Sequence, residues 1–438
     1  MSDPRAIEAR RRISEGYIAC KAAVLGVDTV TFQPKGVIDA NGDRLVTESW
    51  DICGQRWLAL AVFDGHLGTS TADYCSQTLP AAIRTKLQDF IQSIGGRLDR
   101  SNIVAHEAQV TALIKDEIEM LEKSIGTAVR EICPRPEKLT KEEARALIEE
   151  HHEILWRAFS GTTLVFALIN VDEHFMWAAG VGDSSVGMSY IGSNGRRKGK
   201  RLCTMHTFQN QQEYFGATML HPASEQPLFD KADRILAWMS VARGTLFSAQ
   251  YYLIWTNALP PAIGDYSLKF RVAYLANLFR YLPGLEDAPF HKYIPKIKTP
   301  PYIIGWPSAR FTDLAPYWSR GLKIFLFSDG VDNIVDGWQV FKPRTHSGAD
   351  PIDVVAALLA DGEIEPRVAG ILGNPVVSRW SGEDGNRAVD VLGNLLGGTD
   401  VERLERVTDL KLLTDDTSGC HPFHMDDTSI IVWQVTDP

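Results

Sequence analysis

Four apolar runs in this sequence each carry an aspartate at one end. These aspartates are Asp64, Asp183, Asp329 and Asp426. Short apolar runs predict buried β-strands. A single aspartate beside a strand is usually a turn residue, but four at strand ends indicate a shared site. Carboxylates suit the hard cations Mg²⁺ and Mn²⁺, whereas zinc prefers His and Cys. Two such ions about 4 Å apart can acidify a water molecule and neutralise the charge of a phosphoryl group.

The elements that must position these aspartates are predicted to be antiparallel hairpins and blocks of helix. An Asn41-Gly42 turn places Asp43 at the start of a strand. The runs 162–171 and 175–181 predict a hairpin. Thr140 begins a capping-box pattern that opens a helix to about residue 159. Strands in hairpins and helices in blocks are typical of an α+β fold with antiparallel sheets.

We predict one catalytic domain over residues 26–438, after an N-terminal extension over residues 1–25. Helical insertions are expected near residues 97–160 and 206–300. The first of these is acidic, and it is either a partner-binding insertion or an ordinary solvated helical face.

Composition excludes several classes of protein. The 438 residues carry a formal net charge of −10, which argues against a nucleic-acid partner. The six cysteines are scattered without a CxxC pair, which indicates a reduced intracellular protein, not a disulfide scaffold or a zinc site. No apolar run reaches the roughly 20 residues of a membrane span, so no membrane partner is expected. The N-terminus lacks the apolar core of a secretory signal, and both a cytoplasmic and a mitochondrial location remain open. We expect a monomer.

Five motifs resemble those of the metal-dependent protein phosphatases, the type 2C serine/threonine phosphatases. The segments are Phe63–Gly68, Ser160–Thr163, Gly182–Ser184, Ser328–Val331 and Asp426–Ser429. Ala262–Tyr266 and Thr299–Tyr302 are similar to two further family segments. Residues 386–398 are similar to a late helix of the pyruvate dehydrogenase phosphatase-like branch. The resemblance spans about residues 36–435, in the family's order.

This resemblance implies a four-layer αββα sandwich of two antiparallel β-sheets flanked by helices. It also implies two Mn²⁺ or Mg²⁺ ions and a third, weaker site. The metal-binding residues would be Asp64, which bridges two ions, the Gly65 carbonyl, Asp329, Asp426 and, at the third site, Asp183. Asp43 would orient a water molecule. His66 would be the general acid that protonates the departing Ser or Thr oxygen of a phosphorylated protein, after attack by a metal-activated water.

Four positions depart from the family pattern. Gly42 replaces a metal-binding Glu, Ile38 replaces a phosphate-binding Arg, and Lys35 is a candidate substitute for that Arg. Pro261 replaces another Arg, and Asn333 an acid, with Asp332 one position early. Two hypotheses follow: an active phosphatase, or a catalytically impaired pseudophosphatase that binds a phosphoprotein or another partner. The retained metal bridge and general acid favour the enzyme.

Overall fold

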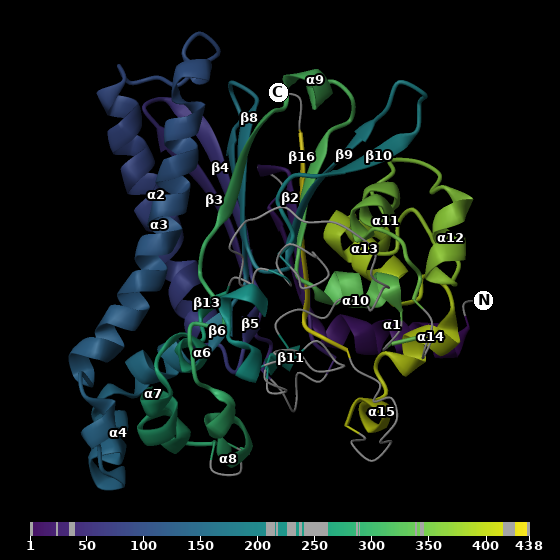
Figure 1. The fold of residues 1–438 in the computed structure, drawn as a ribbon. Helices are drawn as coiled ribbons and strands as arrows, with labels where there is room; N and C mark the ends of the chain where they lie inside the picture. Colours follow the sequence, from purple (N-terminus) through teal and green to yellow (C-terminus); the bar gives the residue numbers. More distant parts are fainter. Residues whose placement is uncertain are drawn as a thin grey trace.

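Two antiparallel sheets form the centre of the fold (Figure 1). The structure, a computed structural model, describes residues 3–22, 25–34, 40–206, 215, 218–225, 234–235, 239–240, 262–285, 288, 290–337, 340–341, 346–414 and 425–435. The six-stranded sheet has the order β1 (Tyr17–Ala22), β2 (Val27–Phe32), β16 (Thr428–Gln434), β15 (Lys323–Phe327), β9 (Ser185–Ile191) and β10 (Arg197–Arg201). The five-stranded sheet has the order β14 (Ser308–Asp313), β8 (Phe175–Val181), β7 (Leu164–Asn170), β4 (Gln55–Phe63) and β3 (Arg44–Ile52).

Strand β4 is apolar from residue 57 to its end, and its packing shows why. Successive side chains of a strand point to opposite faces of the sheet. Leu58, Leu60 and Val62 belong to the core between the two sheets. Trp57 and Phe63 belong to the core under the helices on the other face. Because both faces of β4 are buried from residue 57 onward, this part of the strand is apolar, whereas Arg56 near its start is exposed.

Helices cover the outer face of each sheet, as Figure 1 shows. The five-stranded sheet packs against α2 (Ser70–Ser93), α3 (Ile103–Ile132) and α4 (Lys141–Phe159). The six-stranded sheet packs against α1 (Pro4–Glu15), α10 (Gly330–Asp336), α11 (Pro351–Leu358), α12 (Pro366–Leu372), α13 (Arg387–Leu396) and α14 (Val401–Arg406). Shorter elements complete the described chain: β11 (Arg234–Ile235), β12 (Met239–Ser240), α6 (Tyr266–Lys269), α7 (Val272–Asn277), α8 (Phe290–Tyr293), α9 (Ala315–Trp318) and α15 (Leu410–Thr414). The predicted αββα sandwich is confirmed.

A third, small sheet lies beside the sandwich and bears on the site. It has the order β13 (Ile263–Gly264), β6 (Gly161–Thr162) and β5 (Gly65–His66). It therefore brings together three segments that are far apart in the sequence.

The N-terminal segment is joined to the sandwich. Strand β1 pairs with β2 along its whole length. Ala9 and Ile13 of α1 are buried in the core of the six-stranded half. The insertion expected near residues 206–300 lies partly outside the described residues, which include 218–225, 262–285 and 290–300.

The predicted capping box at the start of α4 is present. Thr140 Oγ1 accepts from the Glu143 backbone N–H at 3.3 Å, and Glu143 Oε2 accepts from the Thr140 backbone N–H at 2.9 Å. Each side chain thus satisfies a donor that the helix itself leaves unpaired.

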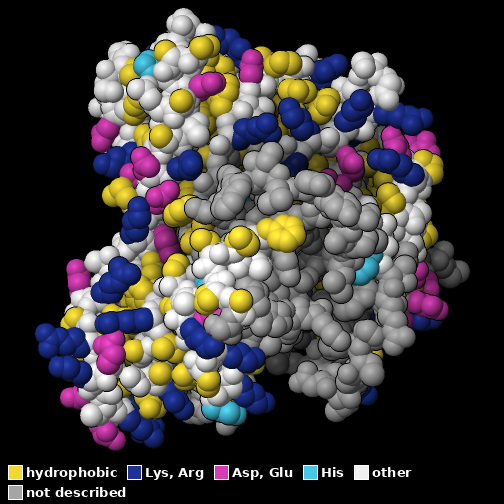
Figure 2. Space-filling model, in the orientation of Figure 1, with side chains coloured by type: hydrophobic (Ala, Val, Ile, Leu, Met, Phe, Trp, Pro, Cys, Tyr) yellow, Lys and Arg dark blue, Asp and Glu magenta, His cyan; other side chains and the backbone are white. Residues whose placement is uncertain are grey.

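The described surface carries both signs of charge. On the face drawn in Figure 2, basic and acidic side chains are interspersed over both halves of the molecule. Among the helices of the described chain, none combines the length and the apolar character needed to cross a bilayer.

Candidate metal centre

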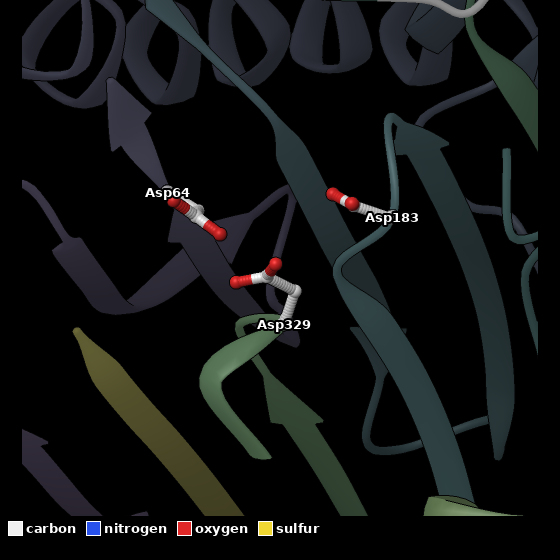
Figure 3. A group of neighbouring side chains, drawn as sticks. All are labelled: Asp64, Asp183 and Asp329. Atoms are coloured by element: carbon white, nitrogen blue, oxygen red, sulfur yellow. The ribbon is translucent and has the colours of Figure 1, made fainter. Parts of the chain in front are cut away.

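Three of the predicted aspartates meet where strands end. Asp64 follows β4, Asp183 follows β8, and Asp329 follows β15. Each offers a carboxylate oxygen, and these oxygens all lie within 4.8 Å of one another. Figure 3 shows the three side chains pointing toward a common space. Strands from both sheets therefore contribute to one acidic centre.

The electrostatics of this centre favour the binding of a divalent cation. Burial raises the pKa of Asp64 well above its usual range, and so do the negative charges of Asp329, Asp43, Asp183 and Asp426. Burial, and then the charge of Asp329, raise the pKa of Asp183 in the same way. A divalent ion that takes oxygen ligands offsets the repulsion between clustered carboxylates and so favours their ionised form. The donor set therefore fits Mg²⁺ or Mn²⁺.

Asp426 lies outside the group of three that meets the 4.8 Å limit. It stands just before β16, and its charge contributes to the raised pKa of Asp64 and of Asp183. Asp183, expected at a looser third site, is one of the three residues in this group.

Asp43 is buried next to the acidic centre. Its Oδ2 accepts a hydrogen bond from Ser328 Oγ at 2.8 Å, which ties the start of β3 to the end of β15. Its Oδ1 is buried and has no hydrogen-bond partner among the described residues. Burial, and then the charge of Asp427, raise the pKa of Asp43 well above its usual range. A buried polar atom of this kind is unfavourable unless a ligand or water completes it.

Gly42, which replaces the family's Glu, has no room for a side chain. A Cβ at this position would overlap the carbonyl oxygen of Gly65. The Gly42 backbone N–H donates to Asp427 Oδ2 at 2.5 Å, and Gln33 Nε2 donates to Asp427 Oδ1. The carboxylate of Asp427, near the other end of the chain, thus lies beside Gly42, the position at which the family has an acidic residue. Lys35, Ile38 and Pro261 lie outside the described residues.

His66 is paired with an acid that sequence reasoning did not single out. Its Nε2 lies 2.7 Å from Oδ2 of Asp265. Burial lowers the pKa of His66, but the charge and hydrogen bond of Asp265 outweigh it, so the pKa is raised overall. Asp265 falls within Ala262–Tyr266, a segment noted only for its resemblance to the family. The spacing of 199 residues gave no signal that the two side chains meet.

Comparisons with known proteins found similarity to one family of phosphatases. Residues 48–215 match the family model "Protein phosphatase 2C". Pyruvate dehydrogenase [acetyl-transferring]-phosphatase 1, mitochondrial, from Homo sapiens and from Pongo abelii is in each case 28% identical over 181 residues. The alignment covers 41% of this chain and only 29% of the length of these relatives.

The crystal structure of a serine-threonine phosphatase 2C from Toxoplasma gondii has the same fold. The TM-score is 0.51 at 12% identity, and the match covers 96% of this chain and 99% of that one. The family model, the two relatives and this fold confirm the resemblance seen in the motifs. The chain therefore resembles the protein phosphatase 2C family over residues 48–215, and it is similar to the pyruvate dehydrogenase phosphatase-like branch of that family.

Proposed function

We propose that this chain is a Mg²⁺- or Mn²⁺-dependent protein phosphatase that hydrolyses phosphoserine or phosphothreonine. One observation carries the proposal: Asp64, Asp183 and Asp329 converge within 4.8 Å, each from a segment that resembles a motif of the family. Such a centre suits a phosphoryl group, whose negative charge a divalent ion can neutralise.

The protein's own groups would hold two ions and a third, weaker one. Asp64, the Gly65 carbonyl, Asp329 and Asp426 would hold the two ions, and Asp183 would hold the third. When bound, Mg²⁺ or Mn²⁺ would acidify a water molecule and offset the charge of the phosphoryl group. Asp43, held by Ser328, would orient that water through its remaining oxygen. His66 would give a proton to the leaving Ser or Thr oxygen.

Gly42 supports a second candidate, the impaired pseudophosphatase. In place of the side chain that helps hold the second ion in the family, the backbones of Gly42 and Gly65 lie against each other. A chain that binds this ion weakly could still recognise a phosphoprotein without hydrolysing it. We favour the enzyme because the three central carboxylates and the His66–Asp265 pair are all present.

The substrate and location rest on the relatives. Their printed names describe phosphatases of pyruvate dehydrogenase in mitochondria. On this basis we favour a phosphorylated mitochondrial protein over a cytoplasmic one, acted on by a monomer of this chain.

The test is hydrolysis of a phosphothreonine peptide across titrations of Mn²⁺ and Mg²⁺. Asp64→Asn and Asp329→Asn are compared with Asp89→Asn, which changes the net charge equally at an exposed position of α2. Saturable, metal-dependent turnover lost only in the first two variants would support the enzyme. Absence of turnover in folded wild-type protein, together with retained binding of the phosphopeptide, would support the pseudophosphatase.

A further inference from the structure

The small sheet places His66 and Asp265 on either side of one glycine. In strand register, His66 of β5 lies opposite Gly161 of β6. Gly264 of β13 lies opposite Gly161 from the other side, and Asp265 follows directly. The histidine therefore lies in one outer strand of a three-stranded sheet and the aspartate directly after the other, with β6 between the two strands.

Gly161 is what allows the two side chains to meet. A Cβ at Gly161 would overlap both the Asp265 carboxylate and the His66 ring. The carboxylate and ring thus use the space that any other residue at this position would fill. Their contact, 2.7 Å between Oδ2 and Nε2, crosses over the middle strand.

Asp265 is held firmly in this position. Its side chain is 1% exposed, whereas that of His66 is 33% exposed. Its backbone lies in the left-handed region, with φ of +52°, which is unfavourable for a residue that carries a side chain. Its N–H donates to the Ser160 carbonyl at 2.9 Å. The surrounding structure therefore overrides the local preference of the backbone.

Helix α3 braces the segment that carries Asp265. Glu122 Oε2 of α3 accepts from the Gly264 N–H at 2.9 Å, and its Oε1 lies 2.6 Å from Lys269 Nζ. The Tyr266 hydroxyl donates to the Glu122 carbonyl at 2.5 Å. One glutamate thus holds residues on both sides of Asp265. This gives part of the acidic helical block an internal role that differs from both readings of its sequence.

The direction of the hydrogen bond selects a tautomer of His66. A carboxylate accepts and does not donate, so Nε2 of the ring must carry a hydrogen. The proton that the ring can release to another group is then the one on Nδ1. In metal and catalytic sites, a partner of this kind fixes both the tautomer and the orientation of the ring.

We propose that Asp265 is a positioning residue that holds His66 by Nε2, so that Nδ1 delivers the proton to the leaving oxygen of the phosphoester. This inference rests on the proposed phosphatase function. As water oxygen bonds to phosphorus, the bond from phosphorus to the Ser or Thr oxygen breaks, and its electron pair stays on that oxygen. The oxygen takes the Nδ1 proton, the attacking water loses one to solvent, and solvent reprotonates Nδ1. Glu122 supports this arrangement through Gly264.

The test compares two substrates that differ in their need for a proton. A phosphothreonine peptide has an alkoxide leaving group that must be protonated, whereas p-nitrophenyl phosphate releases a stable phenolate. Asp265→Asn keeps the shape of the side chain and tolerates left-handed backbone. We expect kcat on the peptide to fall about 10- to 100-fold, part of the roughly 10²- to 10⁴-fold that general acids contribute. The kcat on p-nitrophenyl phosphate, the KM and the Mn²⁺ affinity should change by less than about 3-fold.

Four further variants sharpen the result. His66→Asn should show the same substrate selectivity with a larger loss, and adding Asp265→Asn to it should cost little more, because the two residues act as a unit. Glu122→Gln should show the pattern more weakly. Asp336→Asn is the matched control, since Asp336 also contacts a histidine, with Oδ2 2.8 Å from Nδ1 of His346. It should match wild type on both substrates.

The outcomes separate the inference from the function on which it rests. Equal losses on both substrates, or no loss, in an active enzyme would overturn the role of Asp265 and leave the phosphatase standing. Absence of wild-type turnover on both substrates would overturn both. Nitrogen-15 NMR of the ring supplies a readout that needs no activity and no folded variant of Asp265. His66 of wild type should carry hydrogen on Nε2, and a neutral ring protonated on Nδ1 alone would refute the inference.

Discussion

The acidic centre should make the protein less stable than a variant that cannot bind its metal. We expect Asp64→Asn to raise the free energy of unfolding in EDTA. The four neighbouring groups with the largest effect on the pKa of Asp64 are all carboxylates. Replacing one carboxylate by an amide of the same shape removes its repulsion with each of the others. Sites built for a ligand commonly lower stability in this way.

The magnitude follows from the distances. Two unit charges 4.8 Å apart repel by roughly 3 kcal/mol at an effective dielectric constant of about 20. Uptake of protons by the cluster reduces this repulsion, because the pKa of Asp64 and that of Asp183 are both raised. We therefore expect a gain of about 1–3 kcal/mol in EDTA. In Mn²⁺ the order should reverse, because a ligand at 100 times its Kd stabilises the wild type by about 2.7 kcal/mol.

The assay is urea unfolding of wild type, Asp64→Asn and Asp89→Asn, each in EDTA and in a Mn²⁺ series. Asp89→Asn removes a charge from an exposed position of α2 and should leave stability within about 0.5 kcal/mol of wild type. If Asp64→Asn is less stable than wild type in EDTA while Asp89→Asn is unchanged, repulsion between the carboxylates does not destabilise the metal-free protein.

Three further outcomes follow from the structure. Gly42→Glu restores the family's acid, yet its side chain would overlap the Gly65 carbonyl. We therefore expect the free energy of unfolding to fall by about 1–3 kcal/mol and the second ion to bind no more tightly. Thermal melting and calorimetric Mn²⁺ titration measure these two effects, and tighter Mn²⁺ binding at unchanged stability would contradict the prediction. Burial lowers the pKa of Lys323 to about 8, from 10.5 in the unfolded chain. The free energy of unfolding should therefore rise by roughly 3 kcal/mol between about pH 8 and pH 10.5, because only the unfolded chain keeps the Lys323 proton over this range. Urea unfolding of Lys323→Met should not show this rise. If the pH dependence of stability is the same in Lys323→Met and wild type, the prediction is wrong. Thr140→Ala removes the cap of α4 and should cost about 1 kcal/mol in urea unfolding, whereas Thr140→Ser should retain most of it; equal losses would show that the hydroxyl is not the cause.

Local patterns predicted much of the fold. The apolar run before Asp64 forms most of β4, because the part of a strand that is buried on both faces is apolar. The turn signal at Asn41-Gly42 correctly placed Asp43 just before β3. The capping box at Thr140 marked the start of α4, since it depends only on residues three apart.

The contacts that complete the centre could not be predicted in this way. His66 and Asp265 meet because Gly161 of β6 lies between them, and neither residue in the sequence predicts contact with the other. Gly42 could be seen as a missing acid, but the approach of Asp427 to its N–H depends on how the two ends of the chain meet. The convergence of Asp183 with Asp64 and Asp329 within 4.8 Å is likewise a matter of tertiary geometry.

The position of β16 has a consequence for how the chain must be made. Residues 428–433 pair with residues 27–32 on one side and with β15 on the other, so the last described strand is interior to its sheet. During synthesis, β2 and β15 therefore each have one edge without hydrogen-bond partners until β16 has been made. For β2, this requires about 400 further residues. Unpaired edges of this kind promote association between chains, and long-range pairing slows folding. A ribosome that stops before residue 428 would release a chain with both edges open, so premature termination should yield aggregates instead of a smaller folded protein.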